Sequence, residues 1–142
     1  MLPWARPDLR LQVDPASSFK SRGGLGRLTG ALVCSINGLG AAWRHEASFR
    51  QEVVLGVLLV PVAAWLAPTG VQAATLIGAI AFVWLVELLN SAIETVADAV
   101  SLERNPLIGR AKDIGSAAVL ISLVLAGCVW LAVLWPVLAG RG

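Results

Sequence analysis

Two long stretches without a charged side chain most constrain the fold of this 142-residue chain. Residues 53–86 and 114–140 contain no Asp, Glu, Lys or Arg, and most of their side chains are apolar. A helix needs roughly 20 mostly apolar residues to cross a bilayer. Because 57% of the chain is hydrophobic and only 14% is charged, an ordinary soluble domain is excluded. The sequence predicts an all-α integral membrane protein.

Turn signals divide these stretches into three predicted membrane spans. A Pro-Thr-Gly turn at residues 68–70 interrupts the first stretch, and Asn105-Pro106 marks a loop over residues 101–109. The first uncharged segment is too short to cross the bilayer alone, so the span must include residues of the charged segment before it. There the side chains of Arg50 and Glu52 extend toward the interface. The predicted spans cover about residues 48–67, 71–100 and 113–137.

The charge distribution predicts the orientation of these spans. Ten of the eleven Lys and Arg residues lie before Val53 or between Asn90 and Asp113, which places both regions on the cytoplasmic side. Residues 1–24 mix prolines and charges without apolar periodicity, so we expect a flexible cytoplasmic tail. Within a membrane domain over residues 25–142, apolar residues recur every three or four positions from Leu25 to Leu39. This predicts an amphipathic helix on the membrane surface.

A polar stripe runs along the second predicted span. At helical pitch its members fall within one narrow sector: Glu87, Asn90, Ser91, Glu94 and Asp98. Three carboxylates in one line repel each other, so protons, a metal or another cation must compensate their charge. A functional role is the default for an acid at membrane depth such as Glu87, whereas Asp98 is equally well explained by an ordinary wet helix face.

Further acids and bases are expected at the same cytoplasmic interface, namely Arg27, Glu46, Glu52, Lys112 and Asp113. Carboxylates from two helices can hold Mg2+ and leave positions for phosphate oxygens. Lys112 and Arg27 can neutralise phosphate charge, and a partly desolvated carboxylate can accept a proton from a hydroxyl. The pattern therefore suggests phosphoryl transfer to a lipid alcohol.

Three sequence strings closely resemble the prokaryotic diacylglycerol kinase family: E-A-S-F-R-Q-E at residues 46–52, E-L-L-N-S-A-I-E at 87–94 and G-R-A-K-D-I-G-S-A-A-V at 109–119. The resemblance implies a homotrimer in the bacterial inner membrane, with a surface helix and three spans per chain. It implies active sites that are shared between protomers, face the cytoplasm and use Mg2+ and ATP to convert diacylglycerol to phosphatidic acid. No nucleic-acid partner is expected.

The resemblance also implies roles for individual residues. By position, Glu87 corresponds to the catalytic base, and Glu46 and Glu94 correspond to the residues that hold the metal of the nucleotide. The implied nucleotide-binding residues are Arg27, Glu46, Glu94, Lys112 and Asp113. The implied lipid-substrate contacts are Ser48, Gln51, Glu52, Trp65, Asn90, Ser116 and Trp130. Gly40 stands where the best-known members carry a cation, so one substrate or phosphate contact of the family is not carried over. Cys34 stands where an aromatic is common.

Three alternatives stay open at this point. The chain could be an undecaprenol kinase of the same family, because that branch has similar active-site strings. It could be a trimeric cation channel, in which the acidic stripe lines a pore. It could also be a structural subunit in which Glu87 and Lys112 form a buried ion pair between helices.

Overall fold

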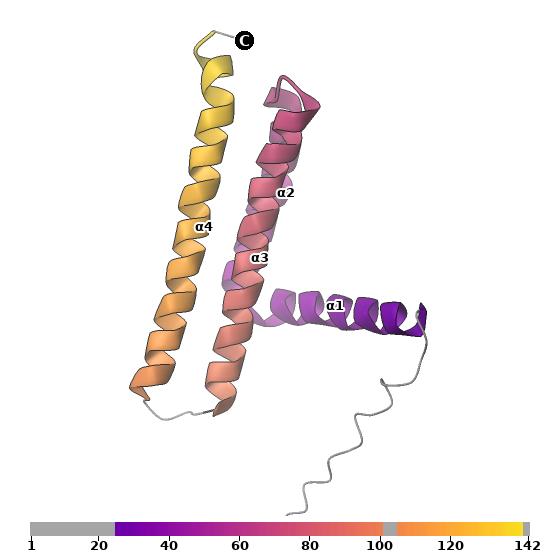
Figure 1. Cartoon of the computed structure of the whole chain (residues 1–142), viewed down its shortest axis with the longest axis vertical. Coiled ribbons are helices and arrows are strands. Elements are labelled where there is room, and N and C mark those ends of the chain that lie inside the picture. Colours follow the sequence, from indigo (N-terminus) through magenta and orange to yellow (C-terminus); the bar gives the residue numbers. More distant parts are fainter. Residues whose placement is uncertain (1–24, 101–104, 141–142) are drawn as a thin grey trace, which may run out of the picture. The chain divides into compact units, whose positions relative to one another are not determined.

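The computed structural model describes residues 25–100 and 105–140. These residues form four α-helices and no strand: α1 (Leu25–His45), α2 (Ala47–Leu66), α3 (Gly70–Val100) and α4 (Pro106–Leu138) (Figure 1). By length and composition α2, α3 and α4 can each cross a membrane. The predicted all-α membrane class is confirmed, while the predicted tail at residues 1–24 lies outside the described residues.

The chain divides into two compact units between Leu39 and Gly40. Residues 25–39 belong to the first unit and are entirely helical, despite their glycines. Their large apolar side chains are exposed and recur at helical spacing: Leu28, Leu32, Ile36 and Leu39. Such an apolar face suits a helix that lies on a membrane surface.

The start of α4 differs from the predicted boundary. The helix begins at Pro106 rather than at residue 113, so the second half of the predicted loop over residues 101–109 is helical. Asn105 is the N-cap, and its side chain accepts a hydrogen bond from the backbone nitrogen of Leu107 at 2.9 Å. Proline is well tolerated at the first helical position, so Asn-Pro starts a helix here. Lys112 and Asp113 therefore lie inside α4 instead of at its N-terminus.

A corner separates α1 from α2 at Glu46, whose backbone is extended (φ −107°, ψ 112°). Arg50 Nη1 donates hydrogen bonds to the carbonyl oxygens of Trp43 at 3.1 Å and Arg44 at 3.3 Å. A guanidinium on the last carbonyls of a helix satisfies otherwise unpaired acceptors and favours the helix end. Arg50 thus fixes the chain around Glu46.

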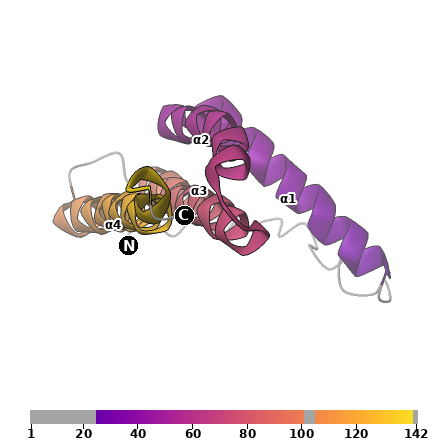
Figure 2. The same ribbon diagram turned by 90° about the horizontal axis from the view of Figure 1, so that it is seen from above.

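Helix α3 lies between α2 and α4 and packs against both (Figure 2). Gly56 on α2 permits close approach, because a Cβ there would lie 2.6 Å from Ile80 Cγ2 and 2.9 Å from Trp84 Cε2. Two indole nitrogens link neighbouring helices: Trp84 Nε1 donates to the Glu52 carbonyl at 3.0 Å, and Trp130 Nε1 donates to the Leu76 carbonyl at 3.3 Å. The middle of this unit is therefore held by packing and by satisfied polar groups.

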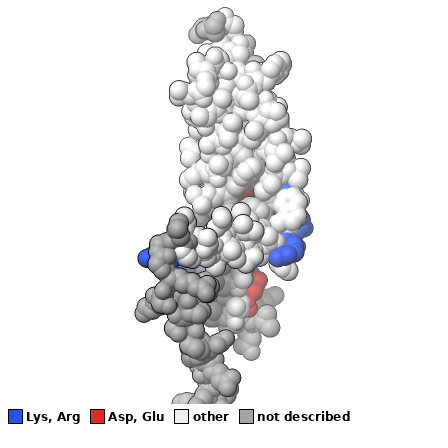
Figure 3. Space-filling model, turned by 90° about the vertical axis from the view of Figure 1, so that its right-hand side faces the viewer, with Lys and Arg blue, Asp and Glu red and all other residues white. Residues whose placement is uncertain are grey.

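The outer surface of these three helices is largely apolar. Leu58, Leu120 and Leu131 are each more than 60% exposed. On the face seen in Figure 3, the upper part of the molecule shows no charged side chain. A surface of this kind is suited to lipid rather than water, and the structure fits a multi-pass membrane protein.

Candidate active site

A groove of about 450 Å3 opens between α2, α3 and α4. Its polar lining contains seven of the residues predicted from the sequence: Ser48, Gln51, Glu52, Glu87, Asn90, Glu94 and Ser116. The first three come from the start of α2, the next three from the polar stripe of α3 and the last from α4. The structure thus brings together residues separated by up to 68 positions of sequence, from Ser48 to Ser116.

Glu87 is the most deeply placed carboxylate of the groove, with only 3% of its surface exposed. Asn90 follows one helical turn later, and its Nδ2 donates a hydrogen bond to Glu94 Oε1 at 3.1 Å. Gly115 of α4 lies directly against Asn90, because a Cβ at this position would overlap Asn90 Oδ1. The close approach of α4 therefore fixes the Asn90 amide, which in turn orients Glu94.

Two polar atoms of this groove are buried without a hydrogen-bond partner in the described parts of the chain: Glu52 Oε2 and Asn90 Oδ1. Buried polar atoms in folded proteins are nearly always paired. Glu52 was predicted to extend toward the interface, but its side chain lines the groove and is half-buried. Burial of these two acceptors is therefore not compensated by hydrogen bonds within the described residues.

The groove is strongly acidic. The charges of Glu94 and Glu46 both repel that of Glu87, and the charge of Glu87 repels that of Glu52. None of the groove-lining residues is a cation. Acids gathered in this way favour a cationic or proton-bearing ligand.

The donor set limits how a metal ion can bind. Within residues 25–100 and 105–140, no three His, Cys, Asp or Glu side chains are arranged to hold one. Mg2+ in phosphate-transferring sites is commonly held by one or two carboxylates, with the other positions taken by phosphate oxygens and water. Of the two predicted metal ligands, Glu94 lines the groove and Glu46, at the N-cap of α2, does not, so the metal assignment stays a prediction.

Lys112 forms an ion pair with Asp98 rather than with Glu87. Its Nζ lies 2.6 Å from Asp98 Oδ1, and both side chains are substantially exposed. Asp98 lies on α3 one turn beyond Glu94, so the ammonium group stands at the end of the acidic stripe. This pairing is not the buried Glu87–Lys112 pair of the structural-subunit alternative.

Six predicted site residues do not line this groove: Arg27, Glu46, Trp65, Lys112, Asp113 and Trp130. Trp65 is 83% exposed near the end of α2, and Asp113 is exposed on α4 beside Lys112. Arg27 is exposed on α1 within the first compact unit. Their roles in binding stay predictions.

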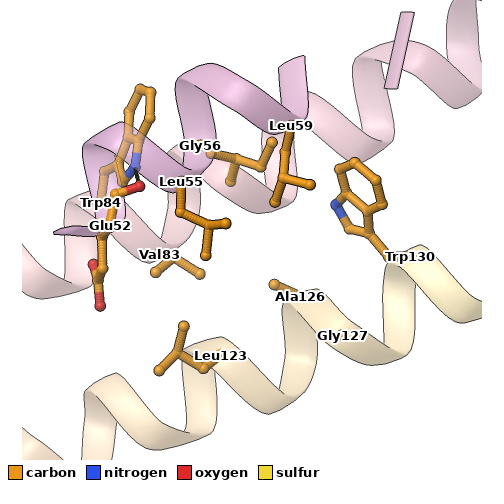
Figure 4. A pocket seen from close by; sticks show the side chains of 11 residues that line it. Glu52, Leu55, Gly56, Leu59, Val83, Trp84, Leu123, Ala126, Gly127 and Trp130 are labelled. Carbon is orange, nitrogen blue, oxygen red and sulfur yellow. Dashed lines mark hydrogen bonds between the residues drawn. The ribbon is translucent and has the colours of Figure 1, made fainter. Parts of the chain in front are cut away.

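A smaller groove, lined mostly by apolar side chains, contains Trp130, another predicted contact (Figure 4). Of its other members, the sequence predicted only Glu52 as a site residue. Gly115 begins a run of small residues in the third string, and such residues are expected to let membrane helices approach closely. The position of Trp84 carried no comparable signal.

Comparison with known proteins identifies the family. Residues 33–134 match the family described as prokaryotic diacylglycerol kinase. The chain is 46% identical over 112 residues to diacylglycerol kinase of Escherichia coli K12, which covers 79% of this chain and 92% of the relative. It is 46% identical over 118 residues to diacylglycerol kinase of Pseudomonas aeruginosa, with 83% and 96% covered. The Haemophilus influenzae diacylglycerol kinase is 41% identical over 112 residues, with 79% and 95% covered. The chain is therefore a membrane kinase that belongs to the prokaryotic diacylglycerol kinase family.

Proposed function

We propose that this protein transfers the γ-phosphate of ATP to the free hydroxyl of diacylglycerol, producing phosphatidic acid and ADP. The observation that carries the proposal is the polar groove, in which a deeply placed carboxylate, Glu87, lies among further acids and hydrogen-bonding groups. The groove continues directly into an apolar groove through shared lining residues. A lipid alcohol has the matching division between a polar head and apolar chains.

In this mechanism Glu87 is the general base. It accepts the hydroxyl proton as the lipid oxygen attacks the γ-phosphorus and the bond to ADP breaks. A base withdrawn from water and repelled by neighbouring acids is suited to take up a proton. Asn90 positions Glu94 through its amide hydrogen bond, and Ser48, Gln51, Glu52 and Ser116 offer polar contacts to the lipid head.

Glu46 and Glu94 hold the divalent metal of the nucleotide, which we assign as Mg2+. The ion, when bound, offsets the charge of the phosphates. Lys112 contacts the phosphates, and Asp113 and Arg27 contact the nucleotide. Asp98, which the sequence analysis did not assign to the site, keeps the Lys112 ammonium group beside the acidic stripe before ATP arrives.

The active assembly we propose is a homotrimer in the bacterial inner membrane, with this site facing the cytoplasm. The positive-inside distribution of Lys and Arg supports that orientation. Trp65 and Trp130 contact the lipid, and the exposed Trp65 does so outside the two grooves of one chain.

The decisive experiment is transfer of labelled γ-phosphate from ATP to diacylglycerol and, separately, to undecaprenol by the detergent-purified protein. We expect Mg2+-dependent labelling mainly of diacylglycerol. Labelling mainly of undecaprenol would contradict the assigned substrate and retain the mechanism. No labelling of either lipid by a folded protein would contradict the proposed function and favour the channel alternative.

The metal assignment has its own test. Glu46→Ala and Glu94→Ala should each raise the Mg2+ concentration needed for half-maximal activity by at least about tenfold, since losing even a residue that only orients a metal ligand typically costs about 10–100-fold in metal affinity. Thr95→Ala is the matched control, because Thr95 is next to Glu94 on α3, its hydroxyl donates to the Ser91 carbonyl and it has no role in the proposed site. Unchanged Mg2+ dependence in both glutamate variants would contradict the assignment.

A further inference from the structure

Trp84 connects the middle of α3 to the turn of α2 that carries Glu52. Its indole Nε1 donates a hydrogen bond to the Glu52 carbonyl oxygen at 3.0 Å. A backbone carbonyl has two lone pairs, so this oxygen can accept from the indole as well as within its own helix. Figure 4 shows the indole beside Glu52. The contact therefore ties a side chain of α3 to the backbone of a residue of the candidate site.

The ring of the same indole fits against Gly56, one helical turn after Glu52. A Cβ at position 56 would overlap Trp84 Cζ2 and lie 2.9 Å from Trp84 Cε2, so glycine leaves the room that the ring occupies. The N–H group and the ring thus contact both ends of a single α2 turn, from residue 52 to residue 56. Two contacts from one rigid ring fix this turn both along and around the helix axis relative to α3.

Two acids of the polar groove lie next to this contact. Glu87 follows Trp84 by three positions, so the two side chains lie on one face of α3. Glu52 and Glu87 line the polar groove together, and the charge of Glu87 repels that of Glu52. Glu52 Oε2 is buried with no hydrogen-bond partner within residues 25–100 and 105–140. The Glu52 carboxylate is thus placed beside a like charge by the backbone beneath it, and Trp84 bonds to that backbone.

We propose that Trp84 is a positioning residue for the lipid substrate: its N–H bond to the Glu52 carbonyl fixes the α2–α3 alignment that holds the Glu52 carboxylate in the polar groove. The inference rests on the proposed function, in which Glu52 contacts the polar head of the lipid. Trp84 acts only through Glu52 and touches none of the reacting groups. Without its N–H bond the two acids move apart, and lipid binding weakens.

The other interhelical indole bond has no comparable position. Trp130 Nε1 donates to the Leu76 carbonyl at 3.3 Å. Leu76 is fully buried and lines neither groove. Loss of that bond affects the packing of α4 against α3 and leaves the α2 backbone beneath Glu52 unchanged. Of these two bonds, only that of Trp84 acts on the backbone of a residue that lines the polar groove.

The test is a double-mutant cycle between Trp84→Phe and Glu52→Gln. Phenylalanine keeps an aromatic ring and removes the N–H donor. For each variant and for the unmodified protein, kcat and KM are measured separately for ATP and for diacylglycerol in one detergent. Thermal unfolding of the same preparations reports their stability. Trp135→Phe on α4 is the matched control, because its indole is exposed and lines neither groove.

We expect Trp84→Phe to raise KM for diacylglycerol about fivefold and to leave KM for ATP unchanged, an effect within the range of single interhelical hydrogen bonds in membrane bundles. In the Glu52→Gln background, Trp84→Phe should have no further effect on this KM, because substitutions that act through one contact are not additive. Trp135→Phe should leave both KM values unchanged.

Three outcomes would overturn the inference. The first is an unchanged KM for diacylglycerol in Trp84→Phe. The second is an increase that adds to that of Glu52→Gln, because Trp84 would then act independently of Glu52. The third is an equal rise in KM for ATP, which would indicate a general loosening of the bundle. Absence of transfer to diacylglycerol by the unmodified protein would overturn the proposed function and this inference with it.

A second substitution applies if Trp84→Phe does not fold. Site-specific incorporation of benzothienylalanine at position 84 keeps a bicyclic ring of the same shape against Gly56 and removes only the N–H group. A rise in KM for diacylglycerol that is absent in the Glu52→Gln background would support the inference. An unchanged KM would overturn it, because packing of the ring alone would then hold α2 in place.

Discussion

The polar groove and the apolar groove differ in whether their buried polar atoms are hydrogen-bonded. In the apolar groove, Trp84 and Trp130 donate their indole N–H groups to carbonyls of neighbouring helices. The buried Ser122 hydroxyl on α4, which lines neither groove, donates to the Val119 carbonyl at 2.7 Å. At the polar end, Glu52 Oε2 and Asn90 Oδ1 are buried without a partner in the described residues, and like charges lie side by side. The hydrogen-bonded groups stabilise the fold. The unpaired and like-charged groups destabilise it, and they suit ligand binding.

This difference shows where stability and function separate in a small membrane bundle. An unpaired buried acceptor costs about 1–3 kcal/mol, and an acid within a span is costly as well. A cluster of such groups at one location is therefore an indicator of function, while the same polar atoms in satisfied pairs indicate packing. Four substitutions test the comparison.

Glu87→Gln should have the largest effect. It removes the proposed base while keeping the shape of the side chain, and general base catalysis typically contributes about 10²–10⁴-fold. We expect kcat to fall by about 10³-fold with no loss of thermal stability, because repulsion by Glu46 and Glu94 is relieved. Kinase assays and thermal unfolding of the same preparation measure both effects.

If the Glu87→Gln protein were unfolded, Glu87 would be needed for stability. That result would contradict the assignment of the polar groove to function and of the apolar groove to stability. Residual activity close to that of the unmodified protein would instead assign the base to another carboxylate. Glu52→Gln distinguishes these cases, since Glu52 lines the same groove as Glu87 and also lines the apolar groove.

Leu76→Ala tests the apolar end. Leu76 is fully buried on α3, and deleting a buried leucine side chain typically costs about 2–5 kcal/mol of unfolding free energy. We expect a clear fall in thermal stability with unchanged kcat for the protein that remains folded. Leu76→Met keeps most of the volume and serves as the control. A fall in kcat without a loss of stability would show that residues of the apolar part also serve the reaction.

The sequence predicted the fold well because the apolar stretches leave few choices. The spans of α2 and α3 were predicted to within about one residue, since length and a Pro-Thr-Gly turn determine them. The start of α4 was missed because Asn105-Pro106 can either end a loop or cap a helix. Local sequence does not distinguish these cases. In the structure the Asn105 side chain accepts a hydrogen bond from the backbone nitrogen of Leu107, which identifies it as a helix cap.

The site was predictable in part for a similar reason. Helical periodicity places Glu87, Asn90 and Glu94 on one face whatever the tertiary structure, and they do line one groove. The contact of Gly115 with Asn90, the pairing of Lys112 with Asp98 and the groove beside Gly127 depend on how neighbouring helices are aligned along each other. Single-sequence patterns do not contain that information.

Gly115→Ala tests the contact that links α4 to the polar stripe. Its Cβ would overlap Asn90 Oδ1, so the Asn90 amide must move and its hydrogen bond to Glu94 weakens. We expect kcat/KM for Mg-ATP to fall about tenfold, in line with an overpacking cost of about 1–3 kcal/mol. Gly109→Ala on the same helix is the control, because a Cβ there meets no atom within 4 Å. Equal activity in both variants would show that Asn90 does not require this contact.

Ser122→Ala should have the smallest effect, although Ser122 is only 1% exposed. Its hydroxyl donates to the Val119 carbonyl within its own helix, and hydrogen bonds of buried side chains in membrane helices contribute about 0.6 kcal/mol on average. Alanine leaves no unpaired donor and fits the same space. We expect thermal stability to change by less than about 1 kcal/mol and kinase activity to stay within about twofold. A large loss of activity would mean that a hydrogen-bonded polar group that lines neither groove also serves the reaction. Hydrogen-bond pairing alone would then not distinguish packing from function in this protein.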